Sequence, residues 1–88
     1  MYQLVFTKDA QKQLVILAKK APNAIKKLEV LLQELREHPR TGTGQVEQLK
    51  HCDEETWSRR ITREHRLTYR IHDDVVEVLV LSVYGHYK

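Results

Sequence analysis

Glu47, Arg66 and His86 are of the residue types that together could cleave an RNA chain without a local sequence motif. Attack by the RNA's own 2′-hydroxyl requires a base for the hydroxyl proton, a cation beside the phosphoryl oxygens and an acid for the departing 5′-oxygen. A carboxylate, a guanidinium and an imidazole can fill those roles. Each residue also has a simpler interpretation, as a surface carboxylate, a member of a salt-bridge ladder and a histidine in a frayed terminus.

Arginine is concentrated in one stretch of the chain, with five arginines between positions 59 and 70. Clustered guanidinium groups commonly meet phosphate, because the planar fork donates two hydrogen bonds to one anion. The cluster, which begins with Arg59 and Arg60, therefore predicts a phosphate-binding surface. The alternative is a solvated, salt-bridged sheet face balanced by Glu64, Asp73 and Asp74.

The bulk properties of the chain narrow its class. Its 88 residues predict a single domain, 1–88, near the lower size limit for a stable core. The single cysteine, Cys52, excludes an internal disulfide and suits a reducing cytosol. The apolar runs are too short for a membrane span, and a net charge of +3 favours an anionic partner. The spacing of the histidines gives no support for a zinc site, so we expect neither metal nor cofactor; the candidates would be His51, His65 and His72.

Two amphipathic helices are predicted, over residues 8–20 and 22–37. Apolar residues recur at helical spacing in both stretches, and Thr7 offers a hydroxyl cap before the first. Pro22 interrupts the hydrogen-bond ladder between them, so the helices form a hairpin or a kinked pair. Pro39 ends the second helix, because a residue that precedes proline avoids helical backbone angles.

The arginine-rich stretch is predicted to form two short strands around a tight polar turn. Trp57 and Ile61 mark the first strand. The second strand alternates cleanly, with a core-facing set formed by Leu67, Tyr69 and Ile71. The side chains of opposite parity should then point to the other face of the sheet; they are Arg66, Thr68 and Arg70.

Three further strands are predicted, over residues 1–6, 46–50 and 75–83. The last is rich in β-branched residues and too apolar for an exposed edge, so we expect it to be central in the sheet. The element order β-α-α-β-β-β-β predicts an α+β domain, with two N-terminal helices packed on a mostly antiparallel sheet.

The place of Glu47 in its strand is left open by the sequence. In a regular strand over 46–50, Glu47 shares a face with Leu49, which should be buried. Either the strand begins after Glu47, or burial raises the pKa of the carboxyl toward a range useful for a base.

Four blocks of the sequence form a recognisable set: Leu49-Lys50-His51, Trp57-Ser58-Arg59-Arg60-Ile61-Thr62, Glu64-His65-Arg66-Leu67-Thr68-Tyr69 and His86-Tyr87. Together they resemble the YoeB/Txe family, toxins of bacterial type II toxin–antitoxin modules within the larger RelE/ParE fold group. The resemblance covers about half of the chain by motif and the whole chain by element order and length. The second and third blocks are the most specific to this family.

The resemblance implies a RelE-like fold and a ribosome-dependent, metal-independent endoribonuclease that cleaves mRNA in the decoding A site and so inhibits translation. By the same resemblance Glu47 is the general base, Arg66 the phosphate-stabilising arginine and His86 the general acid. Tyr87 would help to place the scissile nucleotide. Two further basic residues would assist at the phosphate, namely Lys50 and Arg60.

The resemblance also implies partners: a net acidic cognate antitoxin, and the 70S ribosome with its rRNA and A-site mRNA, in the bacterial cytoplasm and away from any membrane. It leaves open whether the toxin is a monomer or a homodimer. The expected docking surface for the antitoxin is the basic face formed by Lys50, Arg59, Arg60, Arg66 and His86.

Two other classes of function stay open. A same-fold toxin of the ParE type would poison DNA gyrase by binding, and a non-catalytic RNA-binding module would need no acid or base. The chain also departs from the family pattern. Asp53-Glu54-Glu55 replace a Leu-Ser-Gly turn and put three carboxylates near a surface expected to meet rRNA, and the terminal His-Tyr pair is preceded by Gly85 and followed by Lys88.

Overall fold

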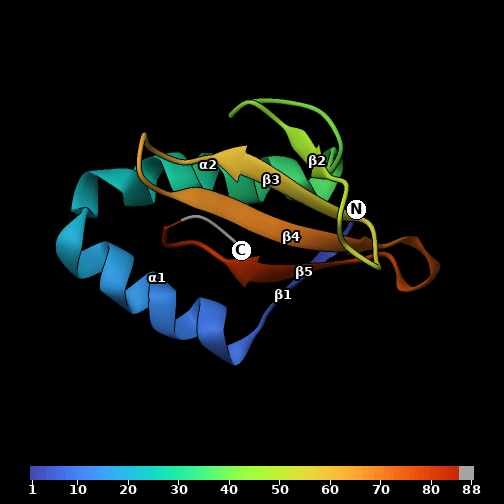
Figure 1. The fold of residues 1–88 in the computed structure, drawn as a ribbon, viewed down its shortest axis with the longest axis horizontal. Coiled ribbons are helices and arrows are strands. Elements are labelled where there is room, and N and C mark those ends of the chain that lie inside the picture. The colour runs from blue at the N-terminus through green and yellow to red at the C-terminus, as the bar shows by residue number, and fades with distance from the viewer. Residues whose placement is uncertain (86–88) are drawn as a thin grey trace.

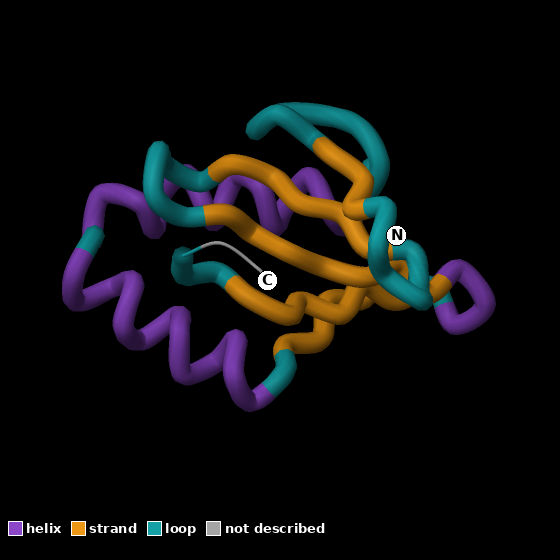
Figure 2. The backbone as a smooth tube through the Cα atoms, in the orientation of Figure 1, coloured by secondary structure: helices purple, strands orange, loops and turns teal. Residues whose placement is uncertain are grey.

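Two helices lie against one five-stranded sheet in the computed structural model, which describes residues 1–85 (Figures 1 and 2). The strand order is β1-β5-β4-β3-β2, with β1 parallel to β5 and the other pairs antiparallel. The predicted α+β class and element order are confirmed. The elements are β1 (Gln3–Phe6), α1 (Lys8–Lys20), α2 (Pro22–Glu37), β2 (Glu47–Leu49), β3 (Thr56–Arg60), β4 (Arg66–His72), a 3-10 turn (Asp73–Val75) and β5 (Glu77–Ser82).

Local signals fix both ends of α1. The Thr7 hydroxyl accepts a hydrogen bond from the Ala10 amide at 3.0 Å, which satisfies one of the free amides of the first turn. At the other end Ala21 adopts φ −141°, ψ 65°, outside the helical region, and Pro22 starts α2 at the position where a missing N–H costs nothing. The break is therefore complete, and the two helices are separate elements.

The core lies between the helices and one face of the sheet. α1 and α2 contribute the fully buried Leu17, Leu31 and Leu35, and the sheet contributes Leu67, Tyr69, Val78 and Val80. The apolar stripes predicted on the helices and the core-facing set of β4 thus meet each other. Among the described residues, no helix is long and apolar enough to cross a membrane.

The arginine-rich stretch is the β3–β4 hairpin. Its register places Ser58 opposite Thr68 and Arg60 opposite Arg66. Because cross-strand partners point to the same side, these four residues share a face, and Tyr69 and Leu67 point to the other side with the helices. We call the first side, which the helices leave uncovered, the helix-free face.

β5 is central in the sheet, as its apolar sequence predicts, and lies between β1 and β4. It begins two residues later than expected. Val75 ends a 3-10 turn and Val76 has a left-handed backbone with φ 51°, so neither extends the strand. Both valines are exposed, at 62% and 47%, which is consistent with their place in a turn.

Candidate active site

The register of β2 brings Glu47 onto the helix-free face. Glu47 pairs with Ser58 of β3, and Ser58 pairs with Thr68 of β4, so the three side chains lie in a row across the sheet. Arg66 stands on the same face, two positions before Thr68. Two of the predicted catalytic residues, 19 positions apart in the sequence, are thereby brought side by side.

Arg66 is held by side-chain and backbone oxygens on its own face. Its Nε donates to the Ser58 hydroxyl, and its Nη2 donates to the carbonyl oxygen of Gln45 at 3.1 Å. The same Nη2 lies 3.9 Å from the Glu47 carboxylate. The side chain is 17% exposed, so its position is fixed while part of the guanidinium faces solvent. Such a group can meet an anion without first being reorganised.

Glu47 lies at the start of β2, and its side chain is 67% exposed. It does share a face with Leu49, which is half-buried. An exposed Glu47 on the same face as Leu49 conflicted with the sequence analysis only because that face was expected to be covered. Neither alternative holds: the strand begins at Glu47 itself, and the carboxylate is not desolvated, because it reaches solvent on the helix-free face.

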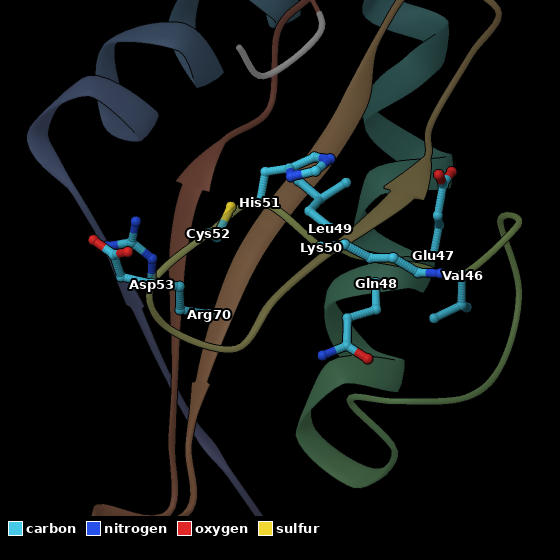
Figure 3. Close-up of a pocket in the computed structure, with 9 residues that line it drawn as sticks. All are labelled: Val46, Glu47, Gln48, Leu49, Lys50, His51, Cys52, Asp53 and Arg70. Carbon is cyan, nitrogen blue, oxygen red and sulfur yellow. The ribbon is translucent and has the colours of Figure 1, made fainter.

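Of the predicted phosphate-binding residues Lys50 and Arg60, the register places Arg60 beside Arg66. Arg60 is half-buried directly opposite Arg66, and its Nε donates to the Thr62 carbonyl at 3.4 Å. Like charges placed opposite each other on a sheet destabilise it unless an anion lies between them. Lys50 is exposed just after β2, and Figure 3 shows its side chain running back along the strand toward Glu47.

Arg59 does not belong to this surface, and its prediction as a phosphate-binding residue is wrong. Its side chain is completely buried on the helix side of β3. The guanidinium forms an ion pair with Glu34 of α2 at 2.7 Å and donates to the Tyr69 hydroxyl and the His38 and Thr41 carbonyls. A guanidinium saturated in this way has nothing left to offer an RNA phosphate.

Two further predicted residues, His86 and Tyr87, lie outside the described residues. The chain that leads to them is fixed: Tyr84 stacks on His65 with ring centroids 4.4 Å apart, and the Gly85 amide donates to His65 Nδ1 at 2.9 Å. The Gly85 carbonyl accepts from the Arg66 amide at 3.0 Å. The last described residue, Gly85, is therefore hydrogen-bonded to Arg66, the candidate phosphate ligand.

A hollow of about 900 Å³ adjoins Glu47 on this side of the molecule (Figure 3). It is formed by β2, by the turn that follows it and by one β4 residue. Figure 3 shows Glu47, Leu49 and His51 pointing to one side of the chain, and Val46 and Gln48 to the other. Its lining is Val46, Glu47, Gln48, Leu49, Lys50, His51, Cys52, Asp53 and Arg70.

The acidic turn between β2 and β3 is largely neutralised by neighbouring bases. Glu55 accepts two hydrogen bonds from Arg40, at 2.7 and 2.8 Å, and these hydrogen bonds hold the pKa of its carboxyl below the usual range. Glu54 lies 3.4 Å from Arg70 and 3.1 Å from His72. The departure from the family's usual turn is thus compensated locally.

The contacts of the described residues also bear on two alternatives from the sequence, a sheet face balanced by acidic residues and a zinc site. The carboxylate of Asp73 binds Arg40 at 2.7 Å and does not balance the hairpin arginines. His65 Nδ1 accepts from Gly85, and His72 lies against Glu54, so the proposed zinc ligands are engaged separately. Within residues 1–85, no three histidine, cysteine or acidic side chains come together as a metal site.

Sequence reasoning missed the residues that hold Arg66, namely Ser58 and Gln45. The first could have been found, because period-two alternation from Trp57 puts Ser58 on the face opposite the core. The second could not, because Gln45 contributes a backbone carbonyl whose position depends on the loop between α2 and β2.

Comparison with known proteins identifies the family of the chain. The family model of the YoeB-like toxin of bacterial type II toxin-antitoxin systems matches residues 6–87. Toxin YoeB of Escherichia coli K12 is 43% identical over 63 residues, which are 72% of this chain and 73% of that protein.

Solved structures of similar proteins share the whole fold. A YoeB/ParE toxin from Agrobacterium tumefaciens has a TM-score of 0.85 and 30% identity, over 97% of this chain and 99% of that one. YoeB of Staphylococcus aureus, solved as a dimer, has a TM-score of 0.81 and 28% identity over 98% of each chain. The same toxin in a heterotetrameric YoeB–YefM complex has a TM-score of 0.80 and 27% identity over 99% of each. The chain thus belongs to the YoeB family, the toxins of bacterial type II toxin–antitoxin systems.

Proposed function

We propose that this toxin is an endoribonuclease that cleaves mRNA in the A site of the 70S ribosome and thereby stops translation. The observation that carries the proposal is the pair formed by Glu47 and Arg66, 3.9 Å apart on the helix-free face. A base and a cation at this separation can serve the 2′-hydroxyl and the phosphoryl oxygens of one phosphodiester. Arg60, opposite Arg66, adds a second positive charge at the same place.

In the proposed reaction the Glu47 carboxylate takes the proton of the 2′-hydroxyl, and the 2′-oxygen attacks the adjacent phosphorus. The bond to the 5′-oxygen breaks, which leaves a 2′,3′-cyclic phosphate on the upstream fragment. Arg66 stabilises the charge that develops on the phosphoryl oxygens. His86 gives its proton to the departing 5′-oxygen. Tyr87 places the scissile nucleotide.

Side chains supply the base, the cation and the acid in this scheme, so no metal is assigned a role. Lys50 and Arg60 assist by drawing the phosphate toward Arg66. The exposed position of Glu47 gives the free toxin little means of orienting a flexible mRNA. The ribosome is proposed to supply that orientation, which is worth several orders of magnitude in rate. The toxin would therefore act in the bacterial cytoplasm, where the ribosomes are.

The chemical step can be tested on ribosomes programmed with a short mRNA. A 2′-deoxy nucleotide at the cleavage position should abolish cutting, while the all-ribose control yields a cyclic phosphate and a 5′-hydroxyl. Cleavage of the deoxy substrate would assign the attack to water and contradict the mechanism. Primer extension without any cut site in a translating extract would contradict the nuclease and favour a gyrase-binding toxin or a simple RNA-binding protein.

We propose also that a net acidic antitoxin inhibits the toxin by covering the helix-free face. The docking surface predicted from the sequence loses Arg59, which is buried, and retains Lys50, Arg60 and Arg66. An acidic or apolar segment that folds there would occupy the groups meant for mRNA phosphate.

Hydrogen exchange on the free and bound toxin measures this directly. Bound antitoxin should protect the amide protons around Arg66 and change the exchange of residues 84–88. Protection confined to the outer surfaces of α1 and α2 would contradict inhibition through the active site.

A further inference from the structure

Arg59, Glu34 and Tyr69 form a polar cluster between α2 and the hairpin, in which Arg59 and Tyr69 are buried and Glu34 is 22% exposed. Arg59 Nη1 donates to Glu34 Oε1 at 2.7 Å, and Arg59 Nε donates to the Tyr69 hydroxyl at 3.0 Å. Burial raises the pKa of the Glu34 carboxyl, but hydrogen bonds from Thr43 and the charge of Arg59 outweigh it, so the pKa lies below the usual range. The cluster is therefore an ion pair, not a neutral contact.

The other hydrogen bonds of this cluster go to the backbone of one segment, residues 38–45, which links α2 to β2. Arg59 Nη2 donates to the carbonyls of His38 and Thr41 at 2.6 and 2.7 Å. The Tyr69 hydroxyl donates to the Pro39 carbonyl at 2.6 Å. Glu34 Oε1 accepts from the Thr43 amide at 2.8 Å.

The other attachments of the segment lie at its start, where Pro39 is buried and Arg40 binds Glu55 and Asp73. Beyond that point, from residue 41 to residue 45, no side chain is buried, so apolar packing does not fix this part of the loop. Its long path between α2 and β2 is the green loop at the top of Figure 1. A stretch of chain without buried side chains keeps a single path only where its backbone groups are bound.

Gly42 shows how closely the segment lies against the cluster. A Cβ on Gly42 would lie 2.3 Å from Glu34 Oε1 and 2.9 Å from Arg59 Nη1, and the residue has φ +126°. Only glycine permits this approach and this backbone angle together.

The same segment ends in the proposed active site. The Gln45 carbonyl accepts from Arg66 Nη2 at 3.1 Å, and Glu47 follows two residues later as the first residue of β2. The Gly44 carbonyl accepts from the Arg60 amide, which ties the segment to β3 just before that point. The position of the segment thus sets both the carbonyl that holds Arg66 and the start of the strand that carries Glu47.

We infer that the cluster Glu34–Arg59–Tyr69 is a positioning unit that sets Glu47 against Arg66 through the segment 38–45. None of its three side chains touches the substrate. The inference rests on the proposed function, and it adds residues that neither the catalytic scheme nor the family resemblance includes. A loop displaced by about 1 Å would cost cleavage roughly 10- to 100-fold, because the reacting groups would no longer be aligned.

The test uses Tyr69→Phe and Gly42→Ala. The first removes the hydroxyl that joins Arg59 to Pro39, and the second puts a methyl group between the segment and the cluster. The control Gln11→Ala removes a surface side chain that donates to the Phe6 carbonyl, away from the segment. Val78→Ala destabilises the core without touching the segment.

Three quantities are measured for each variant. They are the single-turnover cleavage rate at saturating ribosomes, the half-saturating ribosome concentration, and the exchange rates of the Thr43 and Arg60 amide protons. Tyr69→Phe and Gly42→Ala should lower the saturating rate roughly 10- to 100-fold. They should leave half-saturation within about twofold and speed exchange at both amides. Both controls should keep the wild-type rate below their melting temperatures, although Val78→Ala melts earlier.

The outcomes separate this inference from the proposed function. Wild-type rates in Tyr69→Phe together with faster exchange of Thr43 would overturn the inference, since the segment would move without consequence. Unchanged exchange would overturn it as well, because the cluster would not hold the segment. A loss of rate in Val78→Ala equal to that in Tyr69→Phe would reduce the effect to stability and overturn the positioning role. An inactive wild type would refute the proposed function, while the exchange rates still decide whether the cluster fixes the segment.

Discussion

The two faces of the β3–β4 hairpin use the same residue type in opposite ways. On the helix side, Arg59 is fully buried and bound to a carboxylate, a phenol and backbone carbonyls. On the helix-free side, Arg66 is held by one hydroxyl and one carbonyl, and its side chain is 17% exposed. The protein satisfies the charge and the donors of Arg59, whereas part of the Arg66 guanidinium faces solvent and can bind an external anion.

The physical reason is the cost of desolvation. A buried guanidinium is tolerated only when its charge and its donors are all satisfied, so Arg59 requires Glu34 and the loop carbonyls. A partly exposed guanidinium keeps contact with water and can exchange that water for phosphate oxygens. The comparison teaches that the number of arginines in a stretch does not measure its capacity for phosphate. The face on which each one lies decides its role.

Arg66→Ala is expected to have the largest effect on activity. It should reduce cleavage by roughly 10²- to 10⁴-fold or more, because it removes the main charge that stabilises the phosphoryl oxygens. The free energy of unfolding should change by only about 1 kcal/mol, the worth of its hydrogen bonds. Single-turnover kinetics on programmed ribosomes and urea denaturation measure the two quantities. A wild-type cleavage rate would remove Arg66 from the mechanism.

Glu47→Ala and His86→Ala should each slow cleavage by roughly 10²- to 10⁴-fold, the usual worth of a positioned base or acid. The matched control is Gln48→Ala, an exposed neighbour of Glu47 on the other side of the same strand. It should cleave within about threefold of wild type, because surface changes remote from the reacting groups have small effects. Equal loss in Gln48→Ala would mean that β2 itself, rather than the carboxylate, is required.

Arg59→Met should act mainly on stability. It leaves the Glu34 carboxylate and several carbonyls without their partner, which should lower the free energy of unfolding by about 3–5 kcal/mol. Arg63→Met is the control from the same hairpin; its side chain is exposed, and the change should stay within about 0.5 kcal/mol. Urea denaturation measures both variants. Equal stability of the two would contradict the distinction between the faces.

The pH dependence of stability should show the smallest effect. The pKa of Glu34 is lower in the folded protein than its usual value of 4.5, since hydrogen bonds from Thr43 and the charge of Arg59 outweigh the effect of burial. This contribution to stability is therefore complete above about pH 4.5 and is lost as the pH falls through the folded pKa. Urea denaturation between pH 6 and pH 3 should give a shallower loss of stability for Glu34→Gln than for wild type. Parallel curves would contradict an ionised Glu34 paired with Arg59.

Local signals were enough to predict most of the fold. The bounds predicted for both helices match α1 and α2, because a threonine cap and a proline act on the backbone immediately next to them. The alternation of Leu67, Tyr69 and Ile71 correctly placed Arg66 on the opposite face. The start of β5 was wrong, because the left-handed backbone of Val76 is not encoded by a glycine or an asparagine.

Arg59 shows where this reasoning stopped. It has the same parity as Trp57 and Ile61, so alternation alone places it on the core side. The prediction that it binds phosphate followed instead from its place in the arginine cluster, although a charged residue in a core is rare. Its buried place depends on Glu34, which is 25 residues away in the sequence and approaches only when α2 packs on the sheet.

The sequence by itself determined the family, the element order and the face on which Arg66 lies, because each depends on residue types and on period-two or helical spacing. Only the tertiary structure decided which groups meet. The β2–β3 register brings Glu47 to Arg66, and the loop between α2 and β2 brings the Gln45 carbonyl to the same guanidinium. Contacts of this kind depend on strand register and on the path of the loop between α2 and β2. Both are settled by the packing of distant elements, which no local pattern encodes.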